Sequence, residues 1–429
     1  MTGFNFLAAP RNSLHLDGRE RADIFSNQVV SLFTAAVSRV GQQLVTSLGA
    51  PLYRDTQASF SIRVFSALLF FVVAALLPAS AQKWNRYGPG TRSQASAIYD
   101  ASTNQMIMFG GQHAPTNINF NDTWTVKGVI STSTTTASNL NWVKVSVLGS
   151  PPGERFGHSA VYNPTSNRMI VFGGGTGFPG PCVNELWVLK NPNAVGGTPT
   201  WTQLTPSGSL PPVREGHVSI YNSATNTMTV FGGTDCSGNY YSDLWILSNA
   251  DGSSGTPAWK KITPVGTPPT ARAGTSATYD SSHNVMTIFG GGATGKTVFN
   301  DVWTLSNANG VGGTATWVQL DPMGTAPTAR SGHVAIYDAA NNRMIVHGGI
   351  NTFSAVQNDS WIFTAANGIG GTPAWTKLVP TVAGPYRKSH TAIYDSVSNK
   401  MVIFGGDSQL PLTFTDDHVL VLTHANGLQ

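Results

Sequence analysis

The chain has 429 residues, of which 46 are Gly, 25 are Pro, 11 are Trp and only 2 are Cys, and charged residues make up 11%. An average globular domain is about 25% charged, so this composition excludes a coiled coil, a charged helical array and a highly charged disordered protein. The net charge of +4 comes from only 25 Lys and Arg residues, and nucleic-acid binding needs such residues in clusters. The composition predicts an all-β protein that does not bind nucleic acid, and the length alone allows two or three domains.

The first 81 residues differ from the rest of the chain. A basic flank at Arg63 precedes an apolar run, Phe65 to Leu77, which a proline ends, and a small-x-small pattern follows and ends at Ala81. This is the layout of a secretory signal peptide, and the run is shorter than the roughly 20 residues that span a bilayer. We expect cleavage after Ala81, no stable membrane span after cleavage, and an exported protein, periplasmic or extracellular, that begins at Gln82.

Residues 1–60 precede this signal, although signal peptides occupy about the first 15–30 residues of a chain. Three interpretations are open: Met1 is a wrongly chosen start and translation begins nearer Ser61, the leader is real and unusually long, or the segment is an uncleaved anchor. No Met occurs between Met1 and Met106, so the sequence does not decide, and we favour the first interpretation. The expected division is 1–60 leader, 61–81 signal peptide and 82–429 a single domain.

From residue 82 onward the sequence contains six copies of one repeat. Each copy has an Arg, a Tyr seven residues later, a Gly-Gly pair that begins eighteen residues after the Arg, an acidic residue, and in most copies a later Trp. The arginines are Arg92, Arg155, Arg214, Arg272, Arg330 and Arg387. The acids are Asp122, Glu185, Asp243, Asp301, Asp359 and Asp417.

Each copy holds four short apolar runs, such as His158–Tyr162, Met169–Phe172, Leu186–Leu189 and Trp201–Leu204. Short runs that are rich in β-branched and aromatic residues and bounded by turn residues are typical of strands. Four strands in each of six repeated units predict a six-bladed β-propeller with four antiparallel strands per blade.

The last copy lacks the Trp of its fourth strand, and Trp84 stands unmatched at the other end of the repeats. We therefore expect the N-terminal strand around Trp84 to complete the last blade. Such closure leaves no free sheet edge between the first and last blades.

This combination of Arg, Gly-Gly, acid-x-Trp and a later Trp resembles the kelch repeat, which is found in galactose oxidase and in many adaptor proteins, and the resemblance extends from Gln82 to the C-terminus. It implies an exported kelch propeller of bacterial type whose first strands line a central channel, with each Arg just ahead of its strand. The copper-ligand motifs and extra domains of galactose oxidase are missing, so we expect no cofactor, no metal and no copper oxidase activity.

The loops between the second and third strands differ in every copy, whereas the turns and linkers on the opposite face are nearly uniform. Varied aromatic loops indicate recognition, although drift in unconstrained loops produces the same pattern. The candidate rim residues are Phe178, Tyr240, Tyr241, Phe299 and Phe353.

By the resemblance, the six arginines form a cationic ring at the channel mouth that binds acidic ligands. Four histidines, each three residues after its Arg, join this candidate ligand-binding set: His158, His217, His333 and His390. The competing interpretation is structural, because each Arg has one acid in its own copy to pair with, and histidines spread one to a blade are typical of hydrogen-bonded structural positions. We favour the structural interpretation for both sets.

Cys182 and Cys236 fall in the second-to-third-strand loops of adjacent copies, on the same face. Two cysteines in an exported chain favour a disulfide bond.

Together these features predict an exported, monomeric kelch module that binds a protein or a glycan through its variable face. The alternative is a carbohydrate-active enzyme of the kelch type, such as a sugar epimerase or mutarotase. It would need an acid or base aimed into a pocket, and no catalytic residue is assigned.

Overall fold

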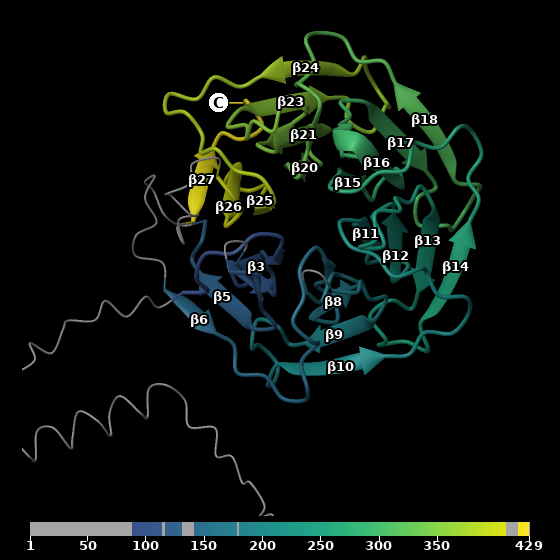
Figure 1. Ribbon diagram of the computed structural model, residues 1–429, viewed down its shortest axis with the longest axis vertical. Helices are drawn as coiled ribbons and strands as arrows, with labels where there is room; N and C mark the ends of the chain where they lie inside the picture. Colours follow the sequence, from purple (N-terminus) through teal and green to yellow (C-terminus); the bar gives the residue numbers. More distant parts are fainter. Residues whose placement is uncertain (1–87, 114–115, 131–140, 178–179, 409–418, 429) are drawn as a thin grey trace, which may run out of the picture. The chain divides into compact units, whose positions relative to one another are not determined.

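The computed structural model describes residues 88–113, 116–130, 141–177, 180–408 and 419–428. The chain divides between Trp84 and Asn85, and all described residues follow this division. They form an all-β propeller in which six sheets surround a central axis (Figure 1), as predicted. The proposed signal peptide, its cleavage site after Ala81 and the strand around Trp84 lie outside the described residues.

Five blades are four-stranded antiparallel sheets, and the sixth has three strands among the described residues. Blade one has β1 (Ser96–Asp100), β2 (Gln105–Phe109), β5 (Thr123–Lys127) and β6 (Trp142–Lys144). Blade two has β7 (Ser159–Asn163), β8 (Arg168–Phe172), β9 (Leu186–Lys190) and β10 (Thr200–Leu204). Blade three has β11 (Val218–Asn222), β12 (Thr227–Phe231), β13 (Leu244–Ser248) and β14 (Ala258–Ile262).

Blade four has β15 (Ser276–Asp280), β16 (Val285–Phe289), β17 (Val302–Ser306) and β18 (Thr316–Leu320). Blade five has β20 (Val334–Asp338), β21 (Arg343–His347), β23 (Ser360–Thr364) and β24 (Ala374–Lys377), and blade six has β25 (Thr391–Asp395), β26 (Lys400–Phe404) and β27 (Leu420–Thr423). Short pairs β3 (Gln112–His113) with β4 (Ile118–Asn119) and β19 (Arg330–Ser331) with β22 (Ile350–Asn351) lie in loops, as does the 3-10 turn η1 (Thr294–Lys296). No helix in the described part of the chain is long and apolar enough to cross a membrane.

The repeated Tyr and Asn close the turn between the first two strands of every blade. In blade two the hydroxyl of Tyr162 donates a 3.0 Å hydrogen bond to Oδ1 of Asn167, whose backbone φ is 51°. Asparagine adopts this left-handed conformation more readily than most residues. The same bond, at 2.9–3.3 Å, joins the Tyr and Asn of the other five blades.

Neighbouring blades pack through a repeated aromatic contact. In five blades the Phe before the Gly-Gly lies against the fourth-strand Trp of the next blade, with ring centroids 4.8–5.0 Å apart. The pairs are Phe109–Trp201, Phe172–Trp259, Phe231–Trp317, Phe289–Trp375 and Phe404–Trp142. The last pair joins blade six to blade one, so the ring of blades is closed among the described residues.

Six residues, each two positions after the repeated Arg, form a second circuit that we call the axial ring: Gln94, Gly157, Gly216, Gly274, Gly332 and Ser389. The backbone N–H of each donates to the carbonyl of its counterpart in the preceding blade, at 2.6–3.0 Å, and Gln94 bonds to Ser389. All six have φ between 54° and 63°. Glycine suits this conformation because it has no Cβ to clash with the backbone.

Candidate functional site

The variable face begins at the residue that follows each repeated Arg. This residue is bridged by backbone pairing to the loop between the second and third strands of its own blade. We call the six residues the channel mouth: Ser93, Phe156, Glu215, Ala273, Ser331 and Lys388. Each lies next to an axial-ring residue in the sequence and pairs through its backbone with the variable loop of its blade.

Five of the six predicted intrablade ion pairs are present. Arg272 is fully buried and donates hydrogen bonds of 2.6 and 2.8 Å to the two carboxylate oxygens of Asp301, and one of 2.9 Å to the carbonyl of Gly290. The other pairs are Arg92–Asp122, Arg155–Glu185, Arg214–Asp243 and Arg330–Asp359, at 2.6–2.8 Å. Arg387 is 8% exposed, and its expected partner Asp417 lies outside the described residues.

The acid-x-Trp motif has its explanation in the same network. The indole N–H of Trp303 donates a 2.7 Å hydrogen bond to Asp301, so one carboxylate accepts hydrogen bonds from both the repeated Arg and the repeated Trp. Burial opposes ionisation of Asp301, but hydrogen bonds from Arg272 and Trp303 and the charge of Arg272 hold its pKa below the usual value. An acidic ligand at this arginine would therefore compete with an ionised, hydrogen-bonded carboxylate, and the cationic binding ring stays a prediction.

The four histidines lie between blades rather than in open solvent. Nε2 of His158 is 2.7 Å from the Ser96 hydroxyl of the preceding blade, and its ring meets Phe109 edge-on at 5.2 Å. His217 and His333 repeat the arrangement with Ser159 and Ser276, at 2.9 Å.

Protonation of these histidines is disfavoured. Burial, with a contribution from the charge of Arg155, lowers the pKa of His158 to about 3. The pKa of His333 is likewise lowered to about 3, mainly by burial. His390, at the next interface, meets the His347 ring edge-on at 5.6 Å.

The predicted rim residues have different surroundings. Tyr241 and Phe299 cover the guanidinium groups of Arg214 and Arg272, at 4.7 and 4.1 Å from ring centroid to Cζ. Phe353 is 89% exposed, on the loop between β21 and β23. Tyr240 is partly buried, and Phe178 lies outside the described residues.

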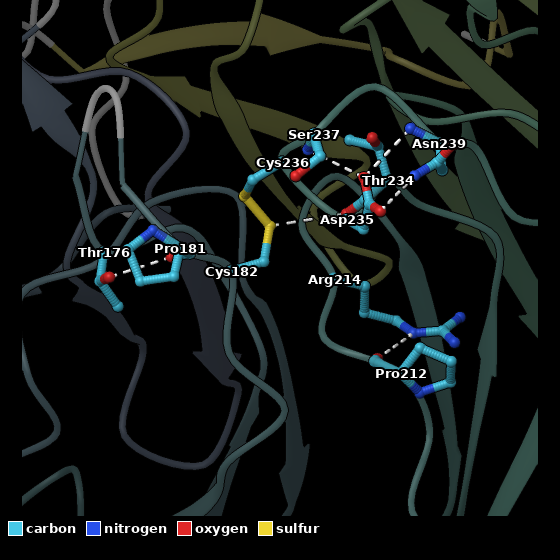
Figure 2. The surroundings of a disulfide bond; sticks show 10 residues. All are labelled: Thr176, Pro181, Cys182, Pro212, Arg214, Thr234, Asp235, Cys236, Ser237 and Asn239. Carbon is cyan, nitrogen blue, oxygen red and sulfur yellow. Dashed lines mark hydrogen bonds between the residues drawn. A yellow bond between two sulfur atoms is a disulfide. The ribbon is translucent and has the colours of Figure 1, made fainter.

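The predicted disulfide between Cys182 and Cys236 is confirmed (Figure 2). Its Cα atoms are 5.5 Å apart, and it joins the β8–β9 loop of blade two to the β12–β13 loop of blade three. The predicted recognition surface therefore includes one covalent cross-link between blades.

Glu215 is a functional candidate that the sequence analysis did not identify. Oε2 of this channel-mouth carboxylate has no hydrogen-bond partner in the described part of the chain, and burial raises the pKa of Glu215 to about 7. The signal was present in the repeats, because this is the copy in which an acid directly follows the Arg. The acid lies one residue after the repeated Arg, outside the repeated motif itself.

Comparisons with known proteins agree with this architecture. The family model described as "KLHDC2/KLHL20/DRC7 Kelch-repeats domain" matches residues 64–193, 165–311 and 312–426. The F-box/kelch-repeat protein At1g51550 of Arabidopsis thaliana is 29% identical over 335 residues, which cover 73% of this chain and 66% of that protein. The Rab9 effector protein with kelch motifs of Mus musculus is 31% identical over 220 residues, which cover 49% of this chain and 51% of that protein.

The matches span about half to two thirds of the length of these two relatives. Among solved structures, one titled "Structure of YjhT" aligns with a TM-score of 0.54 over 79% of this chain and 99% of that chain, at 14% identity. That likeness shows the fold alone. The repeated Arg, Gly-Gly and acid-x-Trp, their closure into six blades, and the family match over most of the sequence together establish that this chain belongs to the kelch-repeat family.

Proposed function

We propose that this kelch propeller is an exported module that binds a protein partner through its variable face. The observation that carries the proposal is the contrast between the repeated residues, which have structural partners, and the loops of the variable face, which differ between blades. Five of the six repeated arginines form intrablade pairs with the repeated acids, and the repeated histidines are buried at blade interfaces, whereas the loops between second and third strands differ in every blade. Recognition residues in propellers and other rigid scaffolds are concentrated in such loops.

Phe353 is the most exposed aromatic side chain among those predicted rim residues that the structure describes. At 89% exposure it offers a large apolar surface to solvent, and its loop is ordered by Asn351, whose Oδ1 accepts the backbone N–H groups of Phe353 and Ala355 at 3.0 Å. Aromatic side chains held on rigid loops are frequent anchors of protein interfaces.

A protein partner is favoured over a glycan by the relatives. One is named as an effector of Rab9 and another combines the repeat with an F-box. These names describe those proteins, and they support the same class of partner here.

The test uses a photo-reactive amino acid at position 353, with position 397 as the matched control. Val397 is 94% exposed and lies in the β25–β26 turn, on the opposite face. Cross-linked proteins are identified by mass spectrometry, prepared in pure form and titrated against wild type, Phe353→Ala and Val397→Ala. We expect Phe353→Ala alone to weaken binding, by about tenfold or more. Equal affinities in all three, or binding only to a glycan array, would reject the proposal.

Export is tested separately, by N-terminal sequencing of the protein recovered outside the cytoplasm. The expected first residue is Gln82. Retention of the protein in the cytoplasm, or a first residue elsewhere, would reject this part of the proposal without affecting the binding test.

A carbohydrate-active enzyme is the second candidate, and one observation favours it. Glu215 places a carboxylate at the channel mouth, and its buried Oε2 has no hydrogen-bond partner in the described part of the chain. Anomerisation of a reducing sugar by the wild-type protein, lost in Glu215→Gln, would establish this class of function in place of simple binding.

A further inference from the structure

We infer that reduction of the Cys182–Cys236 disulfide creates a binding site for a thiophilic divalent cation, Zn²⁺, formed by the two cysteines and Glu215. The two Sγ atoms and a carboxylate oxygen of Glu215 all lie within 4.8 Å of one another. It is the single such group of His, Cys and acidic side chains among the described residues. Thiolates and carboxylates are ligands that Zn²⁺ takes in tetrahedral sites, and thiolates select it over harder cations.

The backbone places these three side chains together without help from the disulfide. Glu215 and Thr234 exchange two backbone hydrogen bonds of 2.9 Å, and Thr234 is two residues before Cys236. On the other side, Gly175 is bridged to Cys182 and to the channel-mouth residue Phe156. The three ligands are thus carried by adjacent backbone ladders of blades two and three.

Each cysteine is also held by its own loop (Figure 2). Beside Cys236, the carboxylate of Asp235 accepts hydrogen bonds from the backbone N–H of Asn239 at 3.0 Å and from its side-chain amide at 2.6 Å. Beside the other cysteine, the hydroxyl and the backbone N–H of Thr176 both donate to the carbonyl of Pro181 at 3.0 Å. None of these bonds involves the sulfur atoms, so we expect each loop to keep its conformation on reduction and the two thiols to stay near each other.

The carboxylate of Glu215 is suited to a cation. Its Oε2 is buried and has no hydrogen-bond partner in the part of the chain that the structure describes, which is costly for a polar atom. Two glycines leave it space: a Cβ on Gly175 would lie 2.8 Å from Oε2, and one on Gly157 would lie 3.3 Å from it. A bound cation would satisfy this oxygen.

The chemistry balances as two separate steps. A dithiol reductant attacks one sulfur, forms a mixed disulfide and then closes its own disulfide, so that two electrons and two protons pass to the cysteine sulfurs. Zn²⁺ then displaces the two thiol protons to solvent and binds two thiolates and one carboxylate. Three protein ligands leave a fourth position for water or for an oxygen atom of a bound partner.

This arrangement couples the redox state to the chemistry of the variable face. In the oxidised protein a covalent bond joins the loops of blades two and three and occupies both sulfurs. In the reduced protein the same loops are joined through the metal, and the channel mouth gains a cation with an open coordination position.

The test is a competition titration of Zn²⁺ against a chromophoric chelator, with the full-length protein in oxidised and reduced forms. Reduction uses a water-soluble phosphine, which is converted to its oxide with oxygen from water. We expect one Zn²⁺ per chain in the reduced form, bound at least about 100-fold more tightly than in the oxidised form, and a thiolate-to-metal charge-transfer band when Co²⁺ replaces Zn²⁺.

Three variants identify the ligands. Cys182→Ser combined with Cys236→Ser should abolish the difference, Glu215→Gln should weaken binding by about tenfold or more, and Glu154→Gln, at an exposed position, should leave the affinity unchanged. Far-ultraviolet circular dichroism checks that each protein is folded. Reduced wild type that binds Zn²⁺ no better than the double serine variant would overturn the inference. Undiminished binding by folded Glu215→Gln would overturn the ligand set.

Discussion

The side-chain amide of Asn163 donates a 2.8 Å hydrogen bond to Oδ2 of Asp251, a residue of the next blade. The donor and acceptor are reversed relative to the counterparts of this pair in other blades. There, an aspartate at the end of the first strand accepts a hydrogen bond from an asparagine in the next blade. Those counterparts are Asn193 to Asp100, Asn367 to Asp280 and Asn426 to Asp338, at 2.6–2.7 Å. Asn163 and Asp251 are both buried. Donor and acceptor have exchanged places in this pair, and the hydrogen bond is kept.

The exchanged pair predicts energetic coupling between Asn163 and Asp251, which a double-mutant cycle measures. Asn163→Asp places two carboxylates face to face, and Asp251→Asn leaves two amides, so each single change should lower the free energy of unfolding by about 1–3 kcal/mol. The double variant restores the arrangement of the three counterparts and should recover at least about 1 kcal/mol of the summed loss. Urea unfolding measures all four proteins, and strictly additive effects would contradict the pairing.

The buried ion pairs predict a large loss of stability when one member is removed. Asp301→Asn leaves the fully buried guanidinium of Arg272 without its charged partner, and should lower the free energy of unfolding by about 3–5 kcal/mol. Asp321→Asn, at an exposed position, is the matched control and should change it by less than about 0.5 kcal/mol. Similar midpoints for the two variants in denaturant would argue against a structural role for the repeated Arg.

The axial ring predicts a stabilising substitution. Gln94 and Ser389 have φ of 54° and 56°, where an L-residue costs roughly 1–2 kcal/mol and glycine does not. After the greater flexibility of glycine in the unfolded chain is subtracted, Gln94→Gly and Ser389→Gly should each raise stability by about 0.5–1 kcal/mol. Gly216→Ala should have the opposite effect, since its φ is 62° and its Cβ would lie 3.3 Å from that of Ala273. Calorimetry that gives all three the same sign would contradict the assignment.

The buried histidines predict acid sensitivity. Burial lowers the folded-state pKa of His158 and His333 to about 3, whereas an unfolded histidine titrates near 6.5. Below pH 6.5 the unfolded chain binds protons that the native protein does not. The free energy of unfolding therefore falls as pH falls from 6.5 toward 3, by about 1.4 kcal/mol per pH unit for each histidine.

His158→Gln should reduce this slope between pH 5 and about 6 by up to that amount, and Val397→Gln, at an exposed position that carries no titratable group, should not. The measurement is the denaturant midpoint as a function of pH. A slope that does not change in His158→Gln would show that this residue is not the titrating group.

The closure expected at the N-terminus remains a prediction, because the strand around Trp84 lies outside the described residues. Five of the aromatic contacts between blades are present, and His347 stands where the sixth Phe would be. Deletion of residues 82–86 should therefore lower the melting temperature by several degrees, because one blade would lose its outer strand. A melting temperature equal to that of the protein beginning at residue 82 would rule out the closure.

Repetition made the fold predictable from the sequence. Strand runs such as Leu186–Leu189 agree with β9 to within one residue, because turn residues and apolar runs recur at nearly fixed spacing. The Arg–acid pairs and the disulfide were also predictable, since each side chain had one plausible partner in a known place. Cation–π contacts such as that of Phe299 with Arg272 were not, because loop conformation decides whether an aromatic side chain turns inward or outward.

Glu215 shows the same limit for the candidate site. Its type and position can be read in the sequence, but its proximity to both sulfurs arises from pairing between two loops and two blades. Repeats predict what the blades share. The features that distinguish one blade from the next depend on three-dimensional contacts that are not repeated in the other blades as far as the structure describes them.

The axial ring has a consequence for how the protein unfolds. In a linear array of repeats the outermost unit has one neighbour and frays first. Here every ring residue both donates and accepts, and the bond from Gln94 to Ser389 joins the first blade to the last. At its axis the propeller thus has no terminal repeat, so local opening of one blade must break bonds to neighbours on both sides.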